Sequence, residues 1–253
     1  MRKRRLRWVG STMQNSVNGS KKGGANNREK ILSAAEILFA EHGYKGCTFR
    51  IISDATGINQ SLLHYYFSTK QNLFSETFQS RAQELVSHRA ELLDHAEAEG
   101  GDAPVPVERL VRCFIEPPLR MLQGNAGQRS FIRIHAQLRS DPIAFSLELR
   151  RQTFGPSTSR FVNTMARACP HLSWEAVAWR FNFMVGSYLV VVTQGGRIED
   201  ISGGQCDSKD IDTAIAHLVP SIVASFQAPD KKTNGALAVT DDGAVGRKGV
   251  RKS

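Results

Sequence analysis

The first regular pattern along the chain is an amphipathic helix over residues 26–43. Apolar residues recur there every three or four positions, as at Ile31 and Ala35, which predicts one buried stripe. Asn27 is a suitable N-cap, and Gly43 suits the left-handed residue that ends such a helix. We therefore expect the ordered part of the chain to begin with this helix.

Two short helices follow, and a turn that contains glycine separates them. Thr48 is a good N-cap for the segment FRIISDAT, Gly57 ends it, and Asn59 caps the next segment, QSLLHYYF. Two helices joined by such a turn, with a third packed behind, form a helix-turn-helix. Its second helix enters the major groove of DNA and is led by its N-terminal residues. The pattern therefore predicts a DNA-reading unit.

The second of these helices combines an apolar side with a polar and aromatic side. Leu63 and Phe67 lie four residues apart and predict the buried side. The outer face and its flanks carry Gln60, Ser61, His64, Tyr65 and Tyr66. A tyrosine ring packs on protein while its hydroxyl reaches a phosphate. We therefore divide this cluster into core residues and candidate DNA contacts.

The following helix begins with a cation in an unfavourable place. Ser68 is read as its start and Gln71 as a capping-box partner, so Lys70 falls in the first turn beside the positive end of the helix dipole. A nearby DNA phosphate would remove that penalty. The alternative is that Lys70 is a solvated surface lysine.

The rest of the chain predicts only helices, since no alternating strand pattern competes. After a long helix from Thr69 to about Ala98, helices are expected at about 107–123, 127–139, 142–153, 157–168, 173–193 and 208–227. Pro117-Pro118 interrupts the first of these six, and Gly155-Pro156 separates two others. The predicted fold class is all-α. We expect a basic disordered tail at 1–27, a helix-turn-helix domain at 28–75, a larger helical domain at 76–228 and a second basic tail at 229–253.

The residues that carry enzyme or metal chemistry are not clustered in this sequence. The four cysteines lie far apart without a CxxC pair, and the chain contains no HExxH, GxSxG or GxxxxGK[ST] motif. We therefore expect no enzyme, no metal site and no cofactor.

The net charge of +9 resides mainly in the two tails. Residues 1–27 hold seven lysines and arginines and no acidic residue, whereas residues 28–228 are nearly neutral. The N-terminal arginines predict a sequence-independent gain in DNA affinity. The alternative is that translation starts at Met13, so that the arginines are absent. With no apolar stretch behind the basic start, and no run of about 18 apolar residues, we expect a cytoplasmic protein without a membrane span.

The segment from Ile31 to Phe74 resembles the DNA-binding part of tetracycline-repressor-type (TetR) regulators without a gap. The matching positions are Ile31, Ala34, Ala35, Leu38, Phe39, Gly43, Tyr44, Thr48, Ile52, Ala55, Gly57, Leu63, Tyr65, Phe67, Lys70 and Leu73. The resemblance implies an all-helical, homodimeric transcription regulator. Its C-terminal domain would dimerise and bind an effector that lowers DNA affinity.

Carried over by position, the resemblance implies two sets of DNA contacts. The candidate base readers are Arg50, Gln60, Ser61 and Leu62, and the candidate phosphate contacts are Thr48, His64, Tyr65, Tyr66 and Lys70. His64 stands where the family usually has tyrosine, and Tyr66 stands where it often has histidine. Because both side chains retain hydrogen-bonding groups, DNA binding remains the interpretation.

Two features of the C-terminal part fit the same family. The segment SWEAVAWRFNFMVGSYLVVV is apolar on nearly every side, which requires cover on both faces. In the family, the last two long helices pair with their copies, which implies a dimer seam at Met184, Tyr188, Leu218 and Ile222. The alternative is burial within one monomer.

A mostly apolar cavity with a few polar groups is expected among residues of several helices. Its candidate lining is Phe114, Phe131, His135, Arg139, Phe154, Phe181 and Tyr188. Such a cavity suits a lipophilic effector with a polar head, such as a fatty acid or an acyl thioester. The alternative for His135 is a satisfied core histidine.

Taken together, the sequence predicts a repressor that binds a palindromic operator in double-stranded DNA as a homodimer and is released by a small lipophilic effector. One alternative is a helical small-molecule carrier or enzyme that shares the fold. Another is a non-specific nucleic-acid or membrane binder that acts through its basic tails.

Overall fold

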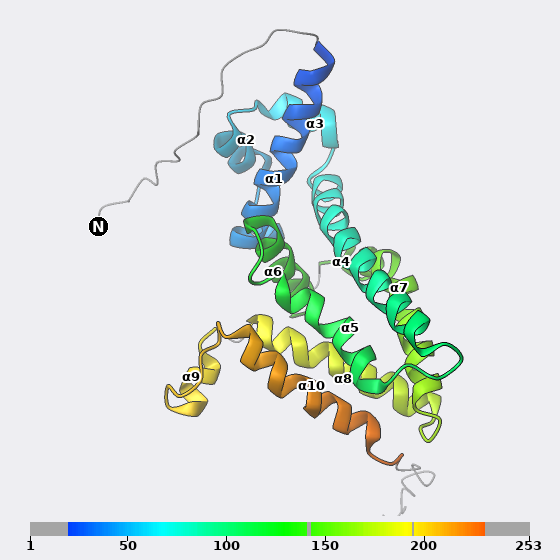
Figure 1. Cartoon of the computed structure of the whole chain (residues 1–253). Coiled ribbons are helices and arrows are strands. Elements are labelled where there is room, and N and C mark those ends of the chain that lie inside the picture. Colours follow the sequence, from blue (N-terminus) through cyan, green and yellow to red (C-terminus); the bar gives the residue numbers. More distant parts are fainter. Residues whose placement is uncertain (1–19, 141–142, 194, 231–253) are drawn as a thin grey trace, which may run out of the picture.

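Every regular element in the part of the chain that the structure describes is a helix. The computed structural model describes residues 20–140, 143–193 and 195–230. The N-terminal unit consists of α1 (Ser20–Gly46), α2 (Phe49–Thr56) and α3 (Gln60–Phe67), and α4 (Lys70–Gly100) leaves it as one long helix (Figure 1). The larger unit adds α5 (Val107–Arg120), α6 (Ala126–Ser140), α7 (Ser146–Ala168), α8 (Trp174–Thr193), α9 (Arg197–Ser202) and α10 (Ile211–Gln227). The predicted all-α class is confirmed.

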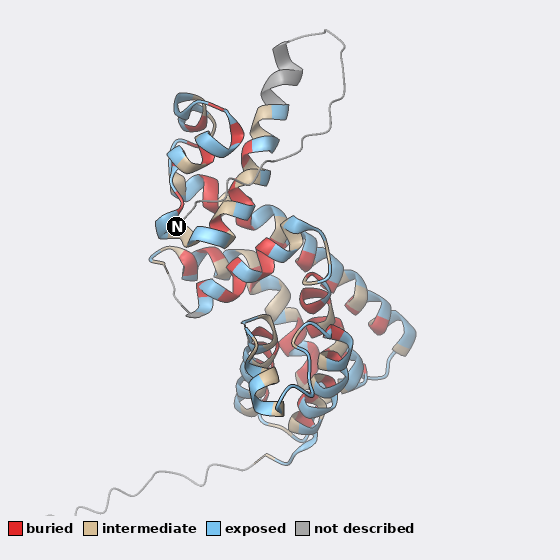
Figure 2. Ribbon diagram, turned by 90° about the vertical axis from the view of Figure 1, so that its left-hand side faces the viewer, coloured by how far each residue is buried: buried red, intermediate tan, exposed pale blue. Residues whose placement is uncertain are grey.

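Two apolar cores hold the helices together, and α4 contributes to both of them. Its first half places Leu73 and Phe78 in the first core, which is shared with α1, α2, α3 and α6. Its second half places Leu93 and Ala96 in the second core, which is shared with α5, α7, α8 and α10. Buried residues accordingly follow the inward faces of the helices in both units (Figure 2). Because α6 packs against α1, the two units share a core and not only a linker.

The start of α1 differs from the expectation. The helix begins at Ser20, so Asn27 lies inside it and is not its N-cap. No proline stands between these two residues, and the glycines at 23 and 24 weaken a helix without stopping it. Gly43 adopts φ +66° and interrupts the helical geometry where a glycine was expected. Most of the two predicted basic tails lies outside the described residues.

The prolines do not end the helices in which they lie. α5 continues through Pro117 and Pro118, and α7 continues through Pro156, so the two helices predicted at 142–153 and 157–168 form one. Pro118 has no N–H for the carbonyl of Phe114 four residues earlier. The Arg89 Nε donates to that carbonyl instead, at 2.9 Å. A side chain from α4 thus replaces the missing helical bond.

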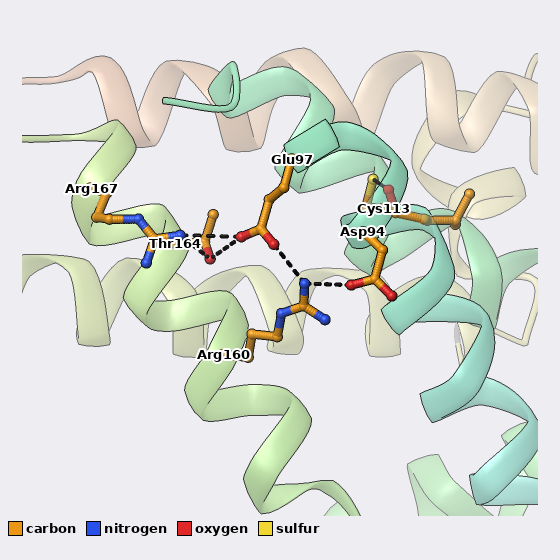
Figure 3. Close-up of polar contacts among 7 residues, drawn as sticks. Asp94, Glu97, Cys113, Arg160, Thr164 and Arg167 are labelled. Atoms are coloured by element: carbon orange, nitrogen blue, oxygen red, sulfur yellow. Dashed lines mark hydrogen bonds and ion pairs between the residues drawn. The ribbon is translucent and has the colours of Figure 1, made fainter. Parts of the chain in front are cut away.

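A polar network fixes the far end of α4 to α7 (Figure 3). Arg160 Nη2 lies 2.5 Å from Asp94 Oδ1 and 2.6 Å from Glu97 Oε2. Glu97 also accepts hydrogen bonds from Arg167 and Thr164 of α7. One acidic side chain of α4 therefore binds three residues on one side of α7.

By length and composition, α8 is apolar enough to cross a membrane, which the apolar runs in the sequence did not predict. Val177, Phe181 and Met184 of this helix are buried in the second core, against α5, α7 and α10. A core helix meets the same criteria of length and composition, so this finding alone does not indicate a membrane protein.

Candidate nucleic-acid interface and ligand cleft

Three local hydrogen bonds cap α2 and α3, one at the start of α2 and two at the turn between the helices. The Thr48 hydroxyl accepts from the first turn of α2 at 3.3 Å. Gly57 adopts φ +70° and donates its N–H to the Ser53 carbonyl at 2.8 Å. The Asn59 Oδ1 accepts from the N–H of Leu62 at 2.8 Å. All three expected capping residues are confirmed, so α3 begins at a fixed angle to α2.

Because one side of α3 is buried in the protein, its opposite side faces solvent. Leu63 and Phe67 are buried. Gln60, Ser61 and His64 are exposed, as is Tyr65, whose side chain is 78% exposed. Arg50 on α2 and the capping residue Thr48 are exposed as well. The polar face expected from the sequence is therefore accessible, and its contacts with DNA stay predictions.

Two of the candidate DNA-contacting residues are partly buried by packing within the protein. Leu62 and Tyr66 are half-buried against the first core, and the Tyr66 ring meets the Tyr65 ring edge-on at 5.5 Å. Leu62 therefore offers less free surface for reading a base than its three fellow candidates. Tyr65 is the more accessible of the two tyrosines.

The protein itself orients His64. Its ring packs edge-on against Phe49 with 4.6 Å between centroids, and its Nδ1 lies 3.2 Å from the carbonyl oxygen of Ser68. When Nδ1 carries the proton and donates to this carbonyl, Nε2 remains an acceptor for another group. Ser68 has φ +58°, a backbone conformation that residues other than glycine rarely adopt.

Lys70 binds within the protein. Its Nζ donates to the Tyr44 carbonyl at 2.8 Å and lies 4.4 Å from the centroid of the Tyr44 ring. The residue is half-buried, so the alternative of a solvated surface lysine is wrong. Thr69, and not Ser68, caps α4, since its hydroxyl accepts from the N–H of Asn72. Lys70 thus ties α4 to the end of α1, and a phosphate would have to compete with this bond.

We predict that Lys70→Met lowers the free energy of unfolding by about 1–2 kcal/mol, because it removes one hydrogen bond and one cation–π contact. Urea unfolding measures this change. The slope of log K against log salt for DNA binding should stay unchanged. Lys45→Met, at an exposed lysine, serves as control. A slope that falls by about one would instead assign Lys70 to a phosphate.

A cleft with a volume of about 450 Å³ opens between α5, α7 and α8, at the end of α6. Its lining residues are Phe114, Arg139, Thr158, Ser159, Val162, Asn163, Trp174, Ala178, Phe181, Asn182, Val185 and Tyr188. Four of the seven predicted effector contacts lie in this set, and none of the lining residues is acidic. The wall combines aromatic rings with amides, hydroxyls and one guanidinium.

The other three predicted contacts, Phe131, His135 and Phe154, do not line this cleft. They are buried in the first core, where the ring centroids of His135 and Phe154 lie 4.9 Å apart. Phe131 and His135 lie one turn apart on α6, which turns both toward Phe78 of α4. His135 still reaches the cleft wall indirectly, because its Nε2 lies 3.1 Å from the Tyr188 hydroxyl.

Comparison with known proteins gives the same two units in the same order. The family described as bacterial regulatory proteins, tetR family, matches residues 31–77, which span the helix-turn-helix. The family described as tetracyclin repressor-like, C-terminal domain, matches residues 112–225, which include the cleft. The chain belongs to the TetR family. The resemblance that begins at Ile31 is thereby confirmed.

Relatives of this TetR-family chain are transcriptional repressors and not enzymes, as expected. The HTH-type transcriptional repressor AcnR of Corynebacterium glutamicum is 32% identical over 118 residues, which are 47% of this chain and 54% of that protein. A second AcnR, from Corynebacterium efficiens, is 43% identical over 117 residues. The chain therefore spans about half the length of the curated relatives it matches.

Solved structures show the shared TetR-family fold. The ketosteroid transcriptional regulator KstR2 of Mycobacterium tuberculosis superposes with a TM-score of 0.54 and 18% identity, over 77% of this chain and 94% of that one. FadR from Bacillus subtilis, solved in complex with stearoyl-CoA, gives 0.51 and 16%, over 78% and 98%.

The sequence patterns missed one buried charge of this TetR-family protein. Arg89 on α4 is only 3% exposed, and its guanidinium carbon lies 3.7 Å from the centroid of the Phe114 ring. Burial lowers the pKa of Arg89 from its ordinary value. The sequence does indicate that Arg89 is buried, because it lies at helical spacing between Leu85 and Leu93, where an apolar residue is expected.

Three of the four residues predicted for the dimer seam are buried within the chain itself. Met184, Tyr188 and Ile222 are buried, and Leu218 is half-buried. The three buried side chains pack α8 and α10 onto α5 and α7, as the alternative of burial within one monomer describes. A different side of α8 remains exposed.

Proposed function

We propose that this TetR-family protein is a cytoplasmic repressor that binds a palindromic operator as a homodimer and leaves it when a small lipophilic effector binds. The exposed face of α3 carries this proposal, because Gln60, Ser61 and His64 are presented by a helix with fixed caps. The N-terminal residues of such a helix contact base edges in the major groove.

The exposed side of α8 supports the homodimer. Trp179, Phe183 and Val190 are 56%, 60% and 57% exposed and lie with Gly186 on one stripe of the helix. α10 packs beside α8 (Figure 1). An apolar stripe of this size in water indicates an interface, and Gly186 leaves room for close approach. A second copy that covers this stripe with its own α8 and α10 would form a four-helix bundle.

The placement of α6 supports communication between cleft and DNA. This helix carries Arg139 at the cleft, while Phe131 and Ile134 pack in the core that includes α1. Gln137 of the same helix lies with its Nε2 3.5 Å from the Ala40 carbonyl of α1. A ligand that shifts α6 would therefore shift α1, against which α2 packs.

Selection of bound sequences from random DNA tests the proposal. We expect the full chain to enrich a palindrome whose half-sites lie about one helical turn apart, since the two recognition helices of a symmetric dimer read adjacent major grooves. Enrichment of no sequence, or of a single unrepeated half-site, would contradict the operator or the dimer respectively.

On the selected site, we predict that Gln60→Ala costs about 1–3 kcal/mol of binding free energy and little on random DNA, because a base contact carries specificity. Gln71→Ala, at an exposed glutamine in the first turn of α4, is the matched control. Fluorescence anisotropy with both DNAs measures the difference. An equal loss on the two DNAs would remove Gln60 from the base-reading set.

A further inference from the structure

Arg89, Arg139 and Arg150 lie near the cleft, and none of them has an acidic partner in the part of the chain that the structure describes. Arg89 is 3% exposed and its Nη2 has no hydrogen-bond partner, and His135 is 2% exposed with an unpaired Nδ1. Arg139 lines the cleft, and the buried Nε of Arg150 is unpaired as well. Among the described residues, no ion pair involves Arg89, Arg139 or Arg150.

These groups also influence one another electrostatically. Burial, followed by the charges of Arg139, Arg89 and Arg150, lowers the pKa of His135 well below its ordinary value. Burial lowers the pKa of Arg150, and the charge of Arg139 lowers it further. The three guanidiniums therefore form one cluster of positive potential, and burial beside them keeps the His135 imidazole neutral.

Other half-buried arginines have acidic partners or, as Arg180 does, donate to several backbone carbonyls. Arg81 is paired with Glu36, and Arg160 is paired with Asp94 and Glu97. Arg89 is buried without an acidic partner, which is strongly unfavourable, and a nearby bound anion would reduce that cost, whereas Arg139 is exposed where it lines the cleft. Arg89 donates its Nε to the Phe114 carbonyl and its guanidinium faces the rings of Phe114 and Tyr188, whereas its Nη2 has no hydrogen-bond partner.

We infer that the cleft binds an apolar monocarboxylic acid through its carboxylate. Resting on the proposed function, this assigns the polar head of the effector to Arg139, which lines the cleft, while Arg89, packed against the Phe114 ring of the wall, adds positive potential. A guanidinium binds a carboxylate with two parallel hydrogen bonds. Phe114, Phe181 and Val185 supply the apolar wall for the rest of the molecule.

The volume and the charge of the cleft favour a free acid over its thioester. About 450 Å³ lies toward the small end of the range of roughly 300–1,000 Å³ for ligand sites. A thioester has no carboxylate at the acyl end, so it leaves Arg139 at the apolar wall unpaired. A free acid both fits the size and supplies the missing negative charge.

Calorimetric titration of the full chain with straight-chain acids from hexanoate to dodecanoate, each beside its primary amide, tests this assignment. We expect at least one acid to bind about 10- to 100-fold more tightly than its amide, which is the strength of hydrogen bonds to a charged partner. Arg139→Gln should remove this preference and leave amide binding unchanged. Arg133→Gln, at an exposed arginine on the same helix, should retain it. Arg89 is a poor probe, because its replacement also frees the Phe114 carbonyl.

The outcomes separate this inference from the proposed function. If no acid binds better than its amide, or if Arg139→Gln keeps the preference, the assignment is overturned. Tighter binding of decanoyl-CoA or inorganic phosphate than of decanoate would also overturn it. If the acids bind as expected but leave operator affinity unchanged, the carboxylate site stands and the effector role fails. If a neutral lipophile alone releases the DNA, the repressor stands and the carboxylate site fails.

Discussion

Phe183→Glu should yield a monomer that no longer holds a palindromic operator. The side chain is 60% exposed in one chain and lies in the middle of the apolar stripe on α8, where its ring approaches that of Trp179. In the proposed dimer, the substitution buries an unpaired carboxylate in each copy. The expected weakening of dimerisation is at least about 100-fold, because each buried charge costs several kcal/mol. Analytical ultracentrifugation measures it.

Leu147→Glu is the matched control for this prediction. Leu147 is 69% exposed on α7 and lies outside the α8 stripe, so the same charge should leave the dimer intact. Circular dichroism must show that both variants are folded. A folded Phe183→Glu protein that sediments as a dimer would place the interface on another surface.

The second large effect is expected at the junction of α1 and α4. Arg81 Nε lies 2.8 Å from Glu36 Oε1, and the Glu36 side chain is only 7% exposed. Arg81→Met leaves this carboxylate buried without its partner. Because the Arg81 side chain is itself 33% exposed, we discount the usual cost to about 2–3 kcal/mol of unfolding free energy.

Urea unfolding tests this value against an exposed ion pair of the same chain. Arg151 pairs with Glu148 at 2.8 Å, with side chains 74% and 51% exposed. Arg151→Met should leave the unfolding free energy nearly unchanged, because solvent screens such exposed pairs. Equal losses for the two variants would show that burial of Glu36 does not decide the cost.

The sequence predicted the elements that local chemistry determines. The Thr48, Gly57 and Asn59 caps depend on hydrogen bonds within one turn, so residue type and spacing suffice to identify them. The prolines of α5 and α7 were predicted to interrupt their helices, but both helices continue, and in α5 a side chain of another helix compensates for a lost backbone bond. Arg89 is such a compensation, and it lies 25 residues away from the carbonyl it serves.

The candidate ligand site was harder to predict, since helical periodicity does not say which neighbour covers an apolar face. Phe131 and His135 lie near the same face of their helix as Arg139, which predicted a place in the cleft, but they pack against α4. Met184 and Tyr188 belong to an apolar helix that needs cover on both sides. They lie on the side that the chain itself covers. Trp179 and Phe183 lie on the other side. The order of contacts around a helix depends on tertiary placement.

The continuity of α4 has a mechanical consequence. With 31 residues at a rise of 1.5 Å each, the helix is roughly 46 Å long and acts as a stiff rod. The Arg160 network holds one end of it, and α3 adjoins the other. Tilting such a rod by about 5° moves its free end by roughly 4 Å, and in a symmetric dimer both ends move. Adjacent half-sites are about 34 Å apart. This small tilt is therefore enough to prevent the two recognition helices, α3 of each copy, from fitting into adjacent major grooves at the same time.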